Sequence, residues 1–246
     1  MHIFNKMVYL LLAVIITSSH ALAQQTGCFF VEGATGVGKT TFVQLLKNNL
    51  PDVAIVYEPV ESFTNVHGAG NILELFFSDP KRWTFTTNIY ITLMHAQAAK
   101  QSMNTAMMIV DRSLYADCYV YGKMACETGM ISALEWNVYK DFFMWITNNN
   151  AIKPCGFIYL KAPAQVVLRR VQQRDRIEEK DLPLQYQINQ ERYYNEWFIE
   201  KKDIAHDIAQ IPVLIIDATQ NFKDDCAIQE KCLNDVKEFI VSSQNS

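Results

Sequence analysis

The chain has 246 residues, of which 50% are hydrophobic, and a formal net charge of −4 at pH 7. This length allows one sizeable hydrophobic core and is short for two domains. No run of basic residues occurs, which argues against a protein that binds nucleic-acid duplexes.

Residues 1–23 have the three parts of a secretory signal peptide. Lys6 supplies a positive charge, residues 8–17 are mostly apolar, and Ala21-Leu22-Ala23 matches the small-x-small pattern of a cleavage site. The apolar stretch is shorter than a membrane span, which needs roughly 20 residues. The leader therefore predicts export. The alternatives are a start at Met7 or later, or an extension before a cytoplasmic domain.

Residues 24–246 are expected to form one domain, because no linker interrupts them. Five short apolar runs predict buried strands at 28–32, 53–57, 106–110, 156–161 and 213–217. Helices are expected at 40–49, 71–77, 84–102, 114–128, 132–148, 164–174, 183–207 and 226–242. Strands that alternate with helices predict an α/β fold, a three-layer α/β/α arrangement around a five-stranded parallel sheet.

Six cysteines would permit disulfides in an exported chain, and Cys226 with Cys232 is the one pair considered. Buried free thiols are the favoured state, because a free cysteine behaves as a small hydrophobic residue.

A nucleotide-binding P-loop follows the first predicted strand and precedes a predicted helix. Its glycines let backbone N–H groups approach phosphate oxygens, and the start of the helix favours negative charge. In this motif the lysine reaches the β- and γ-phosphates, and the hydroxyl after it completes a magnesium site. The expected nucleotide-binding residues are Gly33, Ala34, Thr35, Gly36, Val37, Gly38, Lys39, Thr40 and Thr41.

Charged residues follow the second and third predicted strands. Glu58 is placed to accept a proton from an attacking hydroxyl, because the carboxyl ends of parallel strands face the ligand crevice. Asp111 is expected to hold magnesium together with Thr40, and Arg112 to neutralise charge on the transferred phosphoryl group. A plain loop carboxylate and a salt bridge at the sheet edge are the non-functional alternatives.

Three arginines, Arg170, Arg174 and Arg176, follow the fourth predicted strand. Arg170 and Arg174 are four residues apart and share a helix face. An arginine segment over the phosphates would exclude water and stabilise transition-state charge. The alternative is a solvated basic face balanced by Glu178 and Glu179.

From about Phe29 to Ile240 the chain resembles the deoxynucleoside kinases, a family that includes deoxycytidine, deoxyguanosine and mitochondrial thymidine kinases. The matching segments are the P-loop, Glu58-Pro59-Val60, Arg82-Trp83-Thr84-Phe85-Thr86 with Asn88, Asp111-Arg112-Ser113-Leu114-Tyr115-Ala116-Asp117, and Arg174-Asp175-Arg176-Ile177-Glu178-Glu179 with Leu182-Pro183-Leu184.

The resemblance implies transfer of the γ-phosphate of ATP to the 5′-hydroxyl of a deoxynucleoside with Mg²⁺, usually by a homodimer that pairs through helices. It assigns catalysis to Glu58, Arg112 and Lys39. The arginine segment covers the phosphates. Asp117 lies on the base side, Tyr121 packs near the base, and Trp83 belongs to the substrate site. The aromatic-rich helix around 134–146 is a candidate dimer face.

Several pocket positions depart from the family pattern. Asn88 stands where the family has a base-reading Gln, and His95 stands where it has an Arg that pairs with Asp117. Thr87 replaces a stacking aromatic residue, and Phe63 replaces a Trp. In the family a Tyr and a Glu together hold the sugar 3′-hydroxyl. Their positions are assigned here to Phe77 and Asn195, and Glu196 is next to Asn195.

These departures predict retained phosphate chemistry and altered nucleoside specificity. The alternatives are a thymidylate or other nucleoside monophosphate kinase, and a catalytically altered nucleotide-binding homologue that acts as a secreted interaction protein.

Overall fold

A computed structural model of the chain describes residues 27–101, 107–149, 152–174, 176, 179 and 182–243. The predicted signal peptide lies outside these residues. No helix in the described part of the chain is long and apolar enough to cross a membrane.

The predicted five-stranded parallel sheet is confirmed. Its strands are β1 (Gly27–Glu32), β2 (Ala54–Val56), β3 (Met107–Asp111), β4 (Gly156–Lys161) and β5 (Val213–Asp217), in the order β2-β3-β1-β4-β5. The second strand is shorter than predicted because its pairing with β3 covers only Ala54–Val56. Strand β1 therefore lies in the middle of the sheet, with the ends of β3 and β4 on either side.

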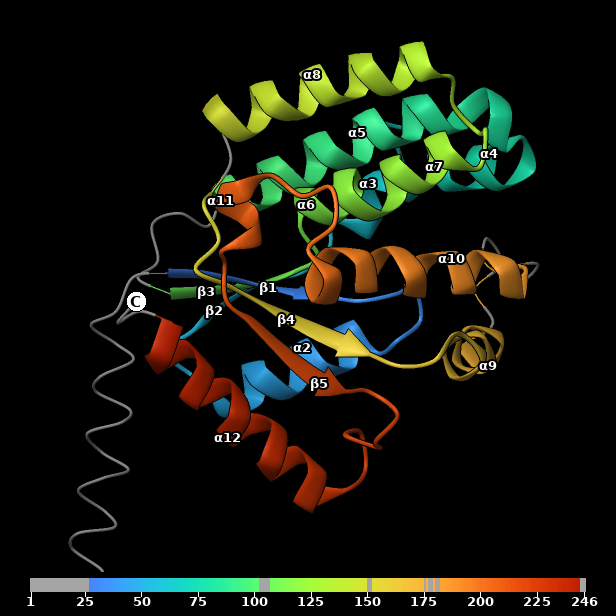
Figure 1. Cartoon of the computed structure of the whole chain (residues 1–246). Helices are drawn as coiled ribbons and strands as arrows, with labels where there is room; N and C mark the ends of the chain where they lie inside the picture. The colour runs from blue at the N-terminus through green and yellow to red at the C-terminus, as the bar shows by residue number, and fades with distance from the viewer. Residues whose placement is uncertain are drawn as a thin grey trace, which may run out of the picture.

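Helices cover both faces of the sheet (Figure 1). Helices α2 (Lys39–Asn49) and α12 (Cys226–Ser243) lie on one face. Helices α5 (Pro80–Gln101), α8 (Ala133–Asn149) and α10 (Leu184–Asn195) lie on the other, with α8 outermost. Helix α9 (Ala164–Arg174) lies beyond the carboxyl end of β4.

Side chains of β1 alternate between two hydrophobic cores. Phe29 and Val31 belong to the core on the α2 and α12 side, whereas Cys28 and Phe30 belong to the core on the opposite side. Successive side chains of a strand point to opposite faces, so a strand that is buried on both faces has to be apolar throughout. This explains why the predicted strands read as continuous apolar runs.

Two predicted helices are interrupted by π-helical turns. The predicted helix 114–128 divides into α6 (Leu114–Ala116), a π-helical segment (Asp117–Gly122) and α7 (Lys123–Glu127). The predicted helix 183–207 is wrong beyond Glu200. After α10 a second π-helical segment covers Glu196–Glu200, Lys201 is left-handed, and α11 (His206–Ala209) follows separately. Such segments are frequent at functional sites.

Two short helices precede α5. Helix α3 (Val60–Thr64) directly follows Glu58-Pro59 and was not predicted. Helix α4 (Ile72–Ser78) begins after Asn71, whose side chain accepts hydrogen bonds from the amides of Leu73 and Glu74. This capping satisfies two of the amides that the first turn of a helix leaves unpaired.

All six cysteines are free thiols, so the pairing considered for Cys226 with Cys232 does not occur. Both residues lie on α12, six positions apart. A rise of about 1.5 Å per residue separates them along the axis by more than the roughly 7 Å that a disulfide can bridge.

Candidate active site

A large cavity lies at the carboxyl ends of the central strands. The P-loop follows β1, Glu58 follows β2, and Asp111 and Arg112 follow β3. Because the strands are parallel, these segments meet at one edge of the sheet. They border a cavity of about 770 Å³, large enough for a drug-sized ligand.

The P-loop forms one wall of the cavity, with Gly33, Gly36 and Gly38 at positive φ angles of 148°, 93° and 112°. A Cβ atom at Gly36 would lie 2.2 Å from Cγ2 of Val171 on α9, so only glycine fits there. Residues 35–41 line the cavity, whereas Gly33 and Ala34 lie behind it and contribute backbone carbonyls that face Lys39.

Lys39 is held beneath the loop. Its Nζ donates to the carbonyl oxygen of Gly33 at 3.1 Å. Burial lowers the pKa of Lys39 to about 8, with a further contribution from Arg112 and opposition from Asp111 and Glu58. A bound polyphosphate would add negative charge and favour the protonated amine.

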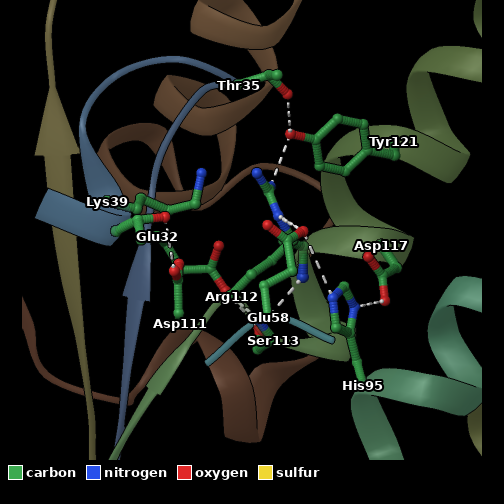
Figure 2. A network of polar contacts seen from close by, with 12 residues as sticks. Glu32, Thr35, Lys39, Glu58, His95, Asp111, Arg112, Ser113, Asp117 and Tyr121 are labelled. Atoms are coloured by element: carbon green, nitrogen blue, oxygen red, sulfur yellow. Dashed lines mark hydrogen bonds and ion pairs between the residues drawn. The ribbon is translucent and has the colours of Figure 1, made fainter. Parts of the chain in front are cut away.

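Glu58 and Arg112 form an ion pair at the centre of the site. Nε of Arg112 donates to Oε1 of Glu58 at 2.9 Å (Figure 2). The Glu58 side chain is 24% exposed. Burial would raise the pKa of Glu58, but Arg112, His95 and Lys39 together hold it well below its usual range. Glu58 is therefore a carboxylate, able to accept a proton.

The backbone of Arg112 is left-handed, with a φ of 67°. This conformation costs a non-glycine residue about 1–3 kcal/mol and persists only where the surroundings enforce it. Here Nη1 of Arg112 donates to the hydroxyls of Tyr121 at 2.7 Å and Tyr194 at 3.0 Å. The guanidinium is thus aimed by contacts with three side chains.

His95 lies between two carboxylates. Its Nδ1 is 2.7 Å from Oδ2 of Asp117, and its Nε2 is 3.6 Å from Oε1 of Glu58 (Figure 2). Burial alone would lower the pKa of His95, but Asp117 and Glu58 outweigh it and raise the pKa to about 9. His95 is therefore protonated at neutral pH, and it links Asp117 to Glu58.

The residues expected to bind magnesium fit a divalent cation. The Thr40 hydroxyl donates to Oδ2 of Asp111 at 3.2 Å. The other oxygen of Asp111 is buried and has no hydrogen-bond partner. Among the described residues, no group of three or more His, Cys, Asp or Glu side chains is arranged to hold a metal ion. One carboxylate and one hydroxyl suit Mg²⁺, which proteins usually bind together with waters and substrate phosphates.

Glu32 lies behind this site at the end of β1 and was not singled out from the sequence. It is fully buried, and its Oε1 accepts hydrogen bonds from both the amide and the hydroxyl of Ser113. Burial raises the pKa of Glu32 to about 7, although Arg112 and Ser113 oppose the shift. Glu32 therefore supports the backbone directly after Arg112.

The three arginines differ in what they contact. Nη1 of Arg170 donates to the carbonyl oxygens of Val37 and Ala218, so this side chain ties the P-loop to the end of β5. Arg174 forms an ion pair with Glu179, and Nη1 of Arg176 lies 3.6 Å from the same carboxylate. All three arginines line the cavity.

Most of the residues predicted to bind the nucleoside line the cavity, but not all of them do. Phe63, Phe77, Asn88, Asp117 and Tyr121 line the cavity. The remaining two predicted residues do not.

Trp83 is outside the cavity lining, with its ring against the Arg82 guanidinium. Asn195 also lies outside, where its Oδ1 accepts a hydrogen bond from the hydroxyl of Tyr159. The expectation that Asn195 is at the sugar site is therefore corrected. Its neighbour Glu196 is paired with Lys123.

A carboxylate that does line the cavity is Glu179, in the segment between α9 and α10. It was read in the sequence only as part of the arginine segment. A buried carboxylate held by Arg174 and Arg176 was not evident, because Glu178 and Glu179 look alike in the sequence.

The loop after β5 was also missed. Residues 220–223 line the cavity, and Phe222 packs edge-to-face against Phe42. The signal available was a polar turn directly after the last strand, at the same edge of the sheet as the P-loop.

Comparison with known proteins agrees with this geometry. The family model described as Deoxynucleoside kinase matches residues 29–241. The chain is 28% identical over 237 residues to deoxycytidine kinase 2 of Gallus gallus, covering 86% of this chain and 89% of that protein. It is 29% identical over 235 residues to deoxycytidine kinase of Homo sapiens, covering 85% and 89%.

A mitochondrial deoxyguanosine kinase of Xenopus laevis is 27% identical over 233 residues, covering 85% of this chain and 88% of that protein. The family match covers nearly all of the described residues, including the P-loop, Glu58 and Arg112. The chain therefore belongs to the deoxynucleoside kinase family and is a phosphotransferase.

Proposed function

We propose that this chain transfers the γ-phosphate of ATP to the 5′-hydroxyl of a deoxynucleoside. The observation that carries the proposal is the Glu58–Arg112 pair, 2.9 Å apart, in one cavity with the P-loop. A carboxylate beside a fixed cation and a phosphate-binding loop is the arrangement that phosphoryl transfer to an alcohol requires.

In this mechanism Glu58 accepts the proton of the 5′-hydroxyl. The hydroxyl oxygen bonds to the γ-phosphorus, and the bond between that phosphorus and the β,γ-bridging oxygen breaks. The low pKa of Glu58 makes it a weak base. This is compatible with phosphoryl transfer, because a loose transition state needs little assistance from a base before the new bond forms. Arg112 and Lys39 neutralise the charge on the equatorial phosphate oxygens.

Thr40 and Asp111 would hold magnesium, as the buried free oxygen of Asp111 suggests. When bound, the ion neutralises phosphate charge and orients the triphosphate. The adenine would lie toward residues 220–223. These residues line the cavity and follow β5, at the opposite edge of the sheet from β2 and Glu58.

The acceptor base would lie against Phe63, Asn88 and Asp117. Among the described residues, Nδ2 of Asn88 and Oγ1 of Thr87 are buried without a hydrogen-bond partner. Unpaired buried polar groups are costly unless a ligand or water satisfies them. These atoms therefore support a polar edge of a nucleobase at this end of the cavity.

Glu179 is proposed to bind the sugar, together with Phe77. Phe77 has no hydroxyl, so Glu179 would act without a phenolic partner from that position. The sequence predicts that both polar groups that hold the 3′-hydroxyl are lost. With Glu179 in the cavity, the carboxylate is kept and only the tyrosine hydroxyl is missing.

The test is turnover of the four common deoxynucleosides by residues 24–246, with Glu58→Gln as the matched control. Glu58→Gln removes both the proton acceptor and the ionic partner of Arg112, and it is expected to lower kcat about 10²-fold or more while ATP still binds. Full activity of Glu58→Gln would exclude Glu58 as the base. Turnover at rates typical of the family would refute altered specificity.

The alternative is a catalytically altered nucleotide-binding homologue that acts as a secreted interaction protein. ATP binding without turnover of any nucleoside would favour it. A nucleoside monophosphate kinase is the weaker alternative, because the family match favours a nucleoside as acceptor. Thymidine and thymidine monophosphate, compared as acceptors, separate the two reactions.

A homodimer through α8 is part of the proposal. This helix lies outermost on its side of the sheet (Figure 1). Its residues Leu134, Val138 and Trp145 are 73%, 49% and 60% exposed. Apolar residues gathered on one exposed helix support a protein contact. A monomeric mass in sedimentation experiments at micromolar concentration would refute it.

Export through residues 1–23 remains a proposal that rests on the sequence pattern alone. Mass spectrometry of protein made by the native host distinguishes cleavage after Ala23 from a start at Met7 or later. An uncleaved, cytoplasmic chain would refute export.

A further inference from the structure

Thr35 of the P-loop is held from three directions. Its amide donates to Oε1 of Gln190 at 2.8 Å, and its carbonyl accepts from Nε2 of Gln187 at 3.1 Å. Its hydroxyl lies 3.3 Å from that of Tyr121. Gln187 and Gln190 belong to α10, 152 and 155 residues away in the sequence.

The same tyrosine contacts the reacting centre. Its hydroxyl accepts from Nη1 of Arg112 at 2.7 Å and donates to Oε1 of Gln190 at 3.0 Å (Figure 2 shows Thr35, Tyr121 and Arg112). The direction is fixed, because a guanidinium can only donate and a carbonyl oxygen can only accept. A continuous chain of hydrogen bonds therefore joins Arg112 to Thr35 through Tyr121 and Gln190.

Packing alone does not account for this network. Both glutamines are completely buried, and Nε2 of Gln190 and Oε1 of Gln187 have no partner among the described residues. A buried amide that is only partly satisfied costs free energy, whereas an apolar side chain of similar size would pack without that cost. The hydrogen bonds of the two glutamines with the backbone of Thr35 offset this cost.

We propose that Tyr121 and Gln190 are positioning residues that couple occupancy of the P-loop to the placement of Arg112. A triphosphate that orders the loop fixes Thr35, and the network then holds Arg112 before the nucleoside arrives. Arg112 consequently loses less conformational freedom when the nucleoside binds, and the nucleoside binds more tightly. The nucleoside part of this inference rests on the proposed function.

The first test measures nucleoside affinity with and without Mg²⁺ and the non-hydrolysable ATP analogue AMP-PNP, by calorimetry on residues 24–246. Deoxycytidine and deoxyguanosine are the probes. In the unmodified protein AMP-PNP is expected to increase affinity at least about 5-fold. In Tyr121→Phe and in Gln190→Leu the ratio is expected to fall to about 1, and the double variant to lose nothing more.

Tyr159→Phe is the control. It removes the hydroxyl of a buried tyrosine that donates to Asn195, on the same helix as Gln190, and it keeps the ring that stacks on Tyr194. It is expected to keep the full ratio. A ratio that is unchanged in Tyr121→Phe, absent from the unmodified protein, or lost additively in the double variant overturns the inference.

The second test needs no nucleoside. It follows solvent exchange of the Nε–H proton of Arg112 by NMR, with the resonance assigned from Arg112→Lys. AMP-PNP with Mg²⁺ is expected to slow this exchange several-fold in the unmodified protein and in Tyr159→Phe, but not in Gln190→Leu. Equal slowing in all three overturns the coupling. If no nucleoside binds, the proposed function fails, and this measurement still decides the inference.

Discussion

Nδ1 of His95 lies 2.7 Å from Oδ2 of Asp117, and both side chains are buried. The opposite nitrogen of the same ring faces Glu58, the proposed catalytic base, at 3.6 Å. The protonated His95 ring therefore connects Asp117, on the side of the cavity proposed for the nucleobase, to Glu58, where proton transfer is proposed.

His95→Gln is expected to change how stability depends on pH. The folded pKa of about 9 exceeds the usual 6.5, so the contribution of His95 is complete below pH about 6.5. It is lost as the pH rises toward 9, by roughly 3 kcal/mol at most. Urea unfolding of both proteins between pH 6 and 9.5 measures the difference.

The difference in free energy of unfolding between the two proteins is expected to shrink across that range. His206→Gln is the control, because that side chain is exposed and its replacement is expected to change the free energy of unfolding little. A constant difference for His95→Gln as well would show that the ring is not held protonated.

Thr40→Val is expected to weaken magnesium dependence. It removes the hydroxyl that bonds to Asp111, whereas Thr40→Ser keeps that oxygen in place. The Mg²⁺ concentration for half-maximal activity is expected to rise about tenfold or more in Thr40→Val and to change little in Thr40→Ser. Similar magnesium titrations for both variants would contradict a role for the hydroxyl.

Gly36→Ala is expected to destabilise the loop, because the new Cβ would meet Cγ2 of Val171 at 2.2 Å and the φ of 93° disfavours alanine. The expected loss in the free energy of unfolding is about 1–3 kcal/mol. Val171→Ala in the same chain removes the clash but not the backbone strain, so it is expected to restore only part of the loss. Denaturant unfolding of the single and double variants measures both, and additive effects would contradict a direct contact.

Glu179→Gln and Asn195→Ala separate the two candidate sugar-site residues. Glu179 lines the cavity, whereas Asn195 bonds to Tyr159 outside it. Glu179→Gln is expected to raise KM for the nucleoside about tenfold or more, with little change in KM for ATP. Asn195→Ala is expected to leave both close to unchanged, and the opposite pattern in steady-state kinetics would return the sugar site to Asn195.

The strands, and the meeting of Glu58 and Arg112 beside the P-loop, were predictable because their signals are local. Continuous apolar runs identify buried parallel strands, and parallel strands bring their carboxyl ends to one edge. Glu58 and Arg112 therefore had to lie near the P-loop once the strands were recognised. Their neighbourhood follows from two short segments and the direction of each strand.

The error at Asn195 arose from the orientation of α10. Gln187, Gln190 and Tyr194 share the face of the helix that contacts Thr35 and Arg112. Each further residue turns a helix by about 100°, so Asn195 points away from that face. The sequence indicates a helix there, but its rotation is set by packing against the sheet.

The sequence by itself determined the family, the parallel sheet and the phosphate-binding chemistry of this protein. Each depends on residue types within a short stretch or on the order of such stretches. Only the tertiary structure decided that His95 lies between Asp117 and Glu58, that Glu179 enters the cavity, and that Gln190 grips Thr35. Those contacts join residues distant in the chain, and their formation depends on how whole helices pack.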